Sequence, residues 1–186
     1  MALTSIDPRA ALIVVDLQKG IVGRPTVHPV DEVVRRAARI AAQFRRRGLP
    51  VVLVNVTGGA PGRIDGGRLA FTPPPDWAEL VDELDAQPGD IRISKQRWGS
   101  FTGTGLDGRL RGLGVTQVVL TGVSTSIGVE STARSAHELG YHVVLATNAM
   151  TDTDAAAHEN SVSRIFPRLG ETASSEEILH MLNDDV

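Results

Sequence analysis

The sequence predicts an α/β protein whose parallel sheet carries helices on both faces, and two observations support that class. Apolar runs of strand length recur along the chain, as in 10–17, 50–56 and 115–121. These runs are nearly continuous rather than alternating, which is typical of strands buried on both faces of a parallel sheet. Helical patterns separate the runs throughout, so right-handed crossovers should join the strands in a three-layer α/β/α arrangement.

Six apolar runs bounded by turn residues predict strands. The first run is interrupted only by Asp16, and the third ends at Lys95. Between the second and third runs, the segment 57–75 is rich in Gly and Pro and is expected to be irregular. Long loops of this kind are often functional. The predicted strands are 10–16, 50–56, 90–94, 115–121, 142–146 and 169–172.

Helices are predicted where apolar residues recur at helical spacing between the strands. The first long helix ends in three consecutive Arg residues and Gly48, and Gly140 and Pro167 stop two later helices. Ser174 and Glu177 have the spacing of a capping box, which predicts the start of a last helix. The predicted helices are 33–47, 77–84, 106–113, 127–139, 154–166 and the segment that follows Ser174.

The composition of the 186-residue chain excludes several classes of protein. Apolar residues make up 41% and charged residues 22%, so the chain is not disordered, and its length predicts a single domain over 1–186. A net charge of -3 leaves no basic field for a nucleic acid partner. The N-terminus lacks a secretory signal pattern and no apolar run reaches the length of a membrane span, so we expect a cytoplasmic protein with no membrane partner.

Asp16, Lys95 and the turn 122–128 are candidates for chemistry because each falls at the carboxyl end of a predicted strand, where parallel sheets bind ligands. A carboxylate at the end of an apolar strand is costly unless it is paired or its pKa is raised. Asp16 is therefore a possible proton donor or acceptor, or else a cap for the following loop. Lys95 could keep Asp16 ionised, or it could be a solvent-exposed residue at the end of its strand. Trp98 and Phe101 either wall a small pocket beside Lys95 or belong to the core.

The turn 122–128 joins a buried strand to a helix, so backbone N–H groups at the helix start should point into the cleft and suit an oxyanion or a carboxylate. The same context is found around serine nucleophiles. However, the Gly-x-Ser-x-Gly pattern needs Gly where Ser126 stands, which disfavours Ser124 or Ser126 in that role. The chain contains no Cys, so a cysteine nucleophile, a disulfide and a thiolate metal site are all impossible.

Two further patterns have simpler explanations than a binding site. The segment 103–108 matches G-x-G-x-x-G but lies well after its strand, so a helix start rich in Gly and Thr explains it better than dinucleotide binding. Asp152, Asp154 and His158 could meet a metal ion. The stronger interpretation is that Asp152 or Asp154 caps a helix that carries His158 on its surface.

Ordered motifs over nearly the whole chain resemble those of a known family, the isochorismatase-like or cysteine hydrolase superfamily, which includes nicotinamidases and carbamoyl amidases. Three motifs in the right order are far more specific than any one of them. The matching pieces are Val14-Val-Asp-Leu-Gln18, Lys95 followed by Arg97, Trp98, Ser100-Phe101 and Gly103-Thr104, then Val119-Leu-Thr-Gly-Val-Ser-Thr-Ser-Ile-Gly-Val-Glu-Ser-Thr-Ala-Arg134, and Gly140-Tyr141.

The resemblance implies a six-stranded parallel sheet in the order 3-2-1-4-5-6, a site built from Asp16, Lys95 and Gly128, and a cis peptide near Val123–Ser124. In the amidases of the family the third site position is the cysteine nucleophile, so Gly128 excludes a thiol mechanism here. Metal-binding members place Asp and His after the second strand. Because residues 55–57 supply neither, we expect no metal and no other cofactor. The residues expected to contact a substrate are Gln18, Arg63, Trp98, Phe101, Val123, Ser124 and Ile127.

The family branch that cleaves isochorismate resembles this chain in having Gly at that position. Its chemistry, protonation of a vinyl ether by an Asp followed by attack of water, needs a general acid and no nucleophile. That branch carries Gln and Arg substrate contacts after the second strand, where this chain offers only Arg63. We expect an acid–base hydrolase for a small anionic substrate, working as a homodimer or larger homo-oligomer. The alternative is a catalytically silent binding or scaffold member of the family.

Overall fold

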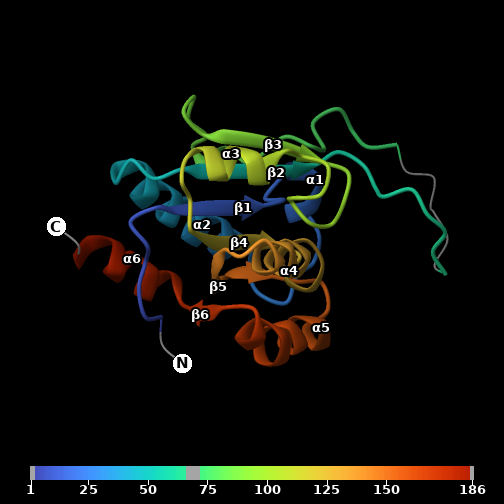
Figure 1. Ribbon diagram of the computed structural model, residues 1–186. Helices are drawn as coiled ribbons and strands as arrows, with labels where there is room; N and C mark the ends of the chain where they lie inside the picture. The colour runs from blue at the N-terminus through green and yellow to red at the C-terminus, as the bar shows by residue number, and fades with distance from the viewer. Residues whose placement is uncertain (1–2, 66–71, 185–186) are drawn as a thin grey trace.

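Six strands form one parallel sheet in the order β3-β2-β1-β4-β5-β6, as expected (Figure 1). The computed structural model describes residues 3–65 and 72–184. Sequence order reverses between β1 and β4, the two central strands, and Leu12 of β1 pairs with Val119 of β4. The strands are β1 (Ala10–Val15), β2 (Val51–Val56), β3 (Ile91–Lys95), β4 (Gln117–Val123), β5 (His142–Thr151) and β6 (Glu171–Ala173).

Helices cover both faces of the sheet, which gives the expected three layers (Figure 1). In the described part of the chain, no helix is long and apolar enough to cross a membrane. The α-helices are α1 (Lys19–Val22), α2 (Val30–Arg46), α3 (Leu106–Gly112), α4 (Glu130–Glu138), α5 (Ala155–Asn160) and α6 (Ser175–Asp184). Short 3-10 or π-helical segments are η1 (Asp82–Leu84), η2 (Thr125–Val129), η3 (Ser161–Ile165) and η4 (Phe166–Arg168).

Alternate residues of each central strand supply two separate hydrophobic cores. Leu12 and Val14 of β1 belong to the core beneath α2 and α6, whereas Ile13 and Val15 belong to the core beneath α3 and α4. All six residues of β1 are buried, which explains its continuous apolar run. The two cores fix the carboxyl ends of β1 and β4 side by side, where the candidate site lies.

The helix predicted over 77–84 is wrong except for its last turn, which is η1. The backbone before η1 instead pairs with the chain that follows β1. Lys19 N donates to Glu79 O at 2.8 Å, and Val81 N donates to Leu17 O at 3.1 Å. Because these backbone groups are used between segments, they cannot close helical turns within 77–81.

The later elements differ from the prediction mainly at their ends. The helix after β4 begins earlier than expected, as the π-helical η2, and the helix after β5 changes from α5 to η3 and then η4. The capping box is confirmed, since Ser174 N donates to Glu177 Oε2 at 2.7 Å and Glu177 N donates to Ser174 Oγ at 3.2 Å. The peptide bond between Val123 and Ser124 is cis, as expected.

Candidate active site

Asp16 stands at the carboxyl end of β1 with its backbone in the left-handed region, at a φ of 52°. Such a conformation costs a residue with a side chain about 1–3 kcal/mol and persists only where the surroundings enforce it. Here Asp16 N donates to Val54 O at 3.0 Å, and Gln18 N donates to Asp16 O at 2.9 Å. These bonds turn the chain sharply after β1 and aim the carboxyl group across the end of the sheet.

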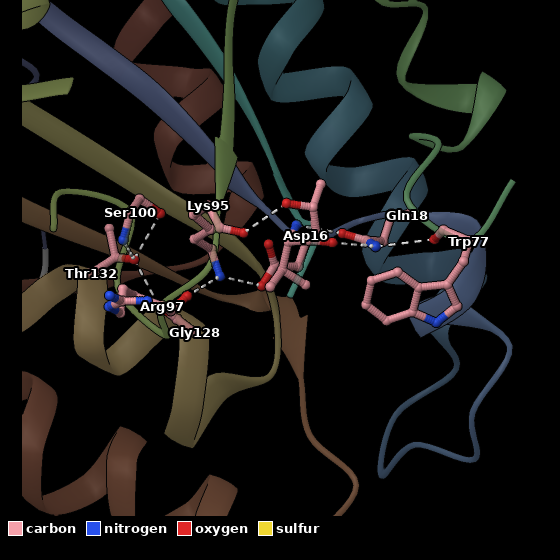
Figure 2. A network of polar contacts seen from close by, with 10 residues as sticks. Asp16, Gln18, Trp77, Lys95, Arg97, Ser100, Gly128 and Thr132 are labelled. Carbon is pink, nitrogen blue, oxygen red and sulfur yellow. Dashed lines mark hydrogen bonds and ion pairs between the residues drawn. The ribbon is translucent and has the colours of Figure 1, made fainter. Parts of the chain in front are cut away.

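Lys95, the last residue of β3, forms a buried ion pair with Asp16. Lys95 Nζ lies 2.7 Å from Asp16 Oδ2, and the two side chains are only 1% and 7% exposed. Lys95 Nζ also donates to the Arg97 carbonyl at 3.2 Å. Figure 2 shows the Lys95 ammonium between these two acceptors. The geometry expected of this pair is therefore present.

Burial and the ion pair act on the pKa of Asp16 in opposite directions. Burial raises the pKa from 3.8 to about 6, and the neighbouring Lys95 ammonium limits that rise. Asp16 Oδ1 is buried and has no hydrogen-bond partner in the described structure. One carboxyl oxygen is thus held by Lys95, whereas the other has no partner among the described residues.

Gly128 faces this pair from the turn after β4. A Cβ placed on Gly128 would lie 3.2 Å from Asp16 Oδ2, 3.2 Å from the Val123 carbonyl oxygen and 3.0 Å from Val15 Cγ1. The Gly128 carbonyl accepts a hydrogen bond of 2.7 Å from Thr132 Oγ1 (Figure 2). The position expected to face Asp16 and Lys95 does so, and its surroundings leave little room for a side chain.

Ser126 differs from the expectation that backbone donors of this turn point into the cleft. Ser126 N and Oγ both donate to Asp152 Oδ2 at 2.8 Å. Asp152 is buried at the end of β5 and also accepts from Thr153 N at 2.7 Å. The Ser126 N–H is therefore engaged by Asp152, which ties the turn to β5.

A cavity of about 270 Å³ opens beside the ion pair. It lies at the carboxyl ends of β1, β3 and β4, at the point where strand order reverses, which is the usual ligand site of such sheets. Asp16, Lys95 and Gly128 line it, and so do four of the expected substrate contacts, namely Trp98, Val123, Ser124 and Ile127.

Three expected substrate contacts do not line this cavity. Gln18 is fully buried, and its side chain donates to the carbonyls of Val56 and Trp77, two residues that line the cavity; Figure 2 shows the contact with Trp77. Phe101 belongs to the core beneath α3 and α4, where its ring stacks on Tyr141. Arg63 is exposed in the segment after β2. Phe101 thus takes the core role that the sequence left open.

A family model and a relative in sequence match almost the whole chain. The family model of the isochorismatase domain matches residues 10–177. The chain belongs to the isochorismatase family. It is similar to the uncharacterized isochorismatase family protein YecD of Escherichia coli O157:H7, with 44% identity over 92% of this chain and 95% of that protein.

Two solved structures of the family support the assignment. An isochorismatase family protein from Burkholderia thailandensis has a TM-score of 0.92 and 37% identity, covering 96% of this chain and 97% of that one. An N-carbamoylsarcosine amidase from Thermoplasma acidophilum has a TM-score of 0.75 and 28% identity, covering 90% of this chain and 97% of that one. The isochorismatase family thus includes hydrolases, and this chain carries its hydrolase fold.

The sequence left Asp152, Asp154 and His158 open either as a metal site or as a helix cap with His158 on the surface. Among the described residues, no group of three or more His, Asp or Glu side chains could hold a metal ion. Asp154 caps α5 by accepting from Ala157 N at 2.8 Å, as expected. His158, however, is buried rather than on the surface, because its Nδ1 lies 2.9 Å from Thr125 Oγ1 behind the turn.

Sequence reasoning missed several cavity residues, among them the large side chains of Arg24 and Trp77, and gave Arg97 no role of its own. Arg97 has a signal in the sequence, since it lies two residues after Lys95. Arg24 and Trp77 have none, because they reach the cavity only through the loop after α1 and through the pairing of residues 77–81 with the chain after β1.

Proposed function

We propose that this member of the isochorismatase family is a cysteine-independent hydrolase, which uses Asp16 as a general acid on a vinyl ether of the isochorismate type. The observation that carries the proposal is the state of the Asp16 carboxyl group. It is buried, it has one oxygen held by Lys95 and one without a partner, and its pKa is raised to about 6. A general acid needs a pKa near the working pH.

The proposed reaction begins with proton transfer from Asp16 to the terminal carbon of the vinyl ether. The C=C electron pair takes the proton, and the adjacent ether oxygen shares its lone pair with the carbon left behind, which gives an oxocarbenium ion. Water then attacks that carbon and returns a proton to the Asp16 carboxylate. Collapse of the hemiketal breaks the C–O bond to the leaving group and releases a ketone and an alcohol.

Lys95 and Gly128 have supporting roles in this scheme. The Lys95 ammonium, 2.7 Å from Asp16 Oδ2, stabilises the carboxylate that forms once the proton has left. Gly128 leaves the space beside Asp16 free of a side chain. A thiol step is not available, because the chain contains no Cys.

The competing possibility is a binding protein that retains the family's cavity without turnover. Two features favour it, namely the absence of a side chain at Gly128 and the use of the Ser126 N–H by Asp152. Both features concern nucleophilic attack on an amide, which the proposed acid-catalysed reaction does not use. A direct assay separates the two possibilities.

Incubation of the purified protein with isochorismate in D₂O tests the proposal. We expect release of pyruvate with one deuterium in its methyl group, because the proton delivered to carbon comes from an acid that has exchanged with solvent. An amide panel run in parallel is expected to release no ammonia. Ammonia release without pyruvate would refute the vinyl-ether reaction, and the absence of every product would support the binding protein.

A further inference from the structure

The cavity carries positive charge that the hydrolysis scheme does not use. Arg24, Lys95 and Arg97 line it, and Asp16 is the one acidic side chain among the described residues that do so. Asp16 already pairs with Lys95. The two guanidinium groups are therefore left uncompensated at the cavity wall.

Neither guanidinium group has a carboxylate partner in the described part of the chain. The Arg24 side chain makes no ion pair or hydrogen bond there, and Arg97 Nη1 donates only to the backbone carbonyl of Gln96, at 3.0 Å. Arg45 shows the contrast, since its Nε and Nη2 both donate to the Asp90 carboxylate and Nη2 also donates to the Leu84 carbonyl. A guanidinium has five donors in a fork that matches a carboxylate.

Both arginines stand on backbone that is fixed in place. The Arg97 carbonyl accepts from Lys95 Nζ at 3.2 Å, which couples Arg97 to the Asp16–Lys95 pair (Figure 2). The loop that carries Arg24 is tied to the end of β5, because Val27 N donates to Asp152 O at 2.8 Å and His28 N donates to Thr151 Oγ1 at 3.0 Å. A fixed backbone limits the ordering cost on binding to that of the two side chains.

Flat aromatic surface accompanies these charges. The chain has two Trp residues, Trp77 and Trp98, and both line this cavity. The Trp77 ring lies on the backbone of Gly20, where an added Cβ would be 1.9 Å from Trp77 Cδ1. Trp98 is 66% exposed, although a large aromatic side chain is usually buried.

We infer that the cavity recognises a planar carboxylate, with its carboxylate on Arg24 and Arg97 and its flat body against the indoles of Trp77 and Trp98. The inference deepens the proposed function and rests on it for the identity of the site. It makes Arg24 and Arg97 the residues that determine specificity, in place of Arg63, which is exposed outside the cavity.

Equilibrium binding of benzoate tests this inference without turnover. Because both tryptophans line the cavity, intrinsic fluorescence reports on its occupancy. Benzamide is the matched neutral probe, since it has the same ring and nearly the same shape. Benzoate is expected to quench the fluorescence at lower concentration than benzamide does.

Two substitutions locate the charge recognition. Arg97→Ala is expected to weaken benzoate binding about tenfold or more, the effect of losing a hydrogen bond to a charged group. Arg24→Ala, at an exposed position, is expected to weaken it about two- to fivefold. Arg92→Ala is the control, because Arg92 is an exposed arginine of β3 outside this cavity, and it should bind benzoate as the unmodified protein does.

The inference is overturned if the unmodified protein binds benzoate no better than benzamide, or if a folded Arg97→Ala variant retains full benzoate affinity. Its failure is distinguishable from failure of the proposed function. Preference for benzoate without release of pyruvate from isochorismate would support the carboxylate site and refute the proposed hydrolase activity. Pyruvate release without preference for benzoate would support the hydrolase activity and refute the carboxylate site.

Discussion

Asp16 combines features that rarely occur together in a residue that serves only the fold. Its backbone is strained, its carboxyl group is buried, and one of its oxygens has no partner. The sequence alone indicated a costly carboxylate at a strand end. It could not show whether Lys95, at the end of the edge strand β3, lies level with Asp16, because that depends on the register of β1, β2 and β3.

The pH dependence of turnover follows from the raised pKa of Asp16. A general acid works only while protonated, so kcat/KM is expected to be highest below pH 6 and to fall about tenfold per pH unit above it. Lys95→Met removes the influence that lowers this pKa, and the falling limb should then move to higher pH. A pH–rate profile of both proteins measures the shift, and a limb at the same pH in both would contradict the assigned roles.

At the scale of elements, the close approach of β1 and β4 places the site. Gly122 has a φ of 118°, and an added Cβ would lie 2.0 Å from the Val15 carbonyl oxygen. We expect Gly122→Ala to destabilise the protein by about 4 kcal/mol or more, because a backbone atom in the central strand cannot move aside. Urea unfolding measures this loss.

Gly108→Ala is the matched control for that substitution. Gly108 lies inside α3 with nothing within 4 Å of an added Cβ, so the change should stabilise the protein by up to about 1 kcal/mol. Equal effects of the two substitutions on stability would show that the close approach of β1 and β4 does not make Gly122→Ala destabilising.

The turn after β4 gives a second prediction at this scale, Gly128→Cys. The chain has no other Cys, so every alkylated thiol is the introduced one. The thiol would enter the cavity that Lys95 also lines, within η2 and just before α4, where the positive charge and the helix dipole lower its pKa. We expect iodoacetamide to alkylate it faster at pH 7 than it alkylates free cysteine.

Crowding at this position should carry a cost in stability. The added Cβ comes within 3.0–3.2 Å of Val15, Asp16 and Val123, so both Gly128→Cys and its control Gly128→Ala are expected to lose about 1–3 kcal/mol. A folded Gly128→Cys variant that alkylates no faster than free cysteine would show that this position is not beside the Asp16–Lys95 pair.

At the scale of the whole molecule, a hydrophobic core packs on each face of the sheet, and the buried face of α2 belongs to one of these cores. Phe44 of α2 is fully buried in that core. Phe44→Ala is expected to lower the free energy of unfolding by about 3–5 kcal/mol. Leu113→Ala, at a position that is 48% exposed, should change it by less than about 0.5 kcal/mol. Chemical denaturation of both variants measures the difference, and equal losses would contradict the burial assigned to Phe44.

The sequence predicted this architecture well because buried parallel strands and amphipathic helices have clear patterns, and the motifs supplied the strand order. Prediction was poorer where a segment pairs with a distant one. The residues before η1 have helical spacing, yet their backbone forms hydrogen bonds with the chain after β1. Gln18 and Phe101 likewise contact residues inside the protein rather than the cavity. Local spacing contains no information on contacts of this kind.

Turnover of Asp16→Asn is the most direct test of Asp16 as the general acid. The substitution preserves the size of the side chain and removes the acid. Pyruvate release from isochorismate is expected to fall about 100- to 10,000-fold, with the circular dichroism spectrum unchanged. Near-normal turnover by a folded Asp16→Asn protein would contradict that role, because no proton would then have come from Asp16.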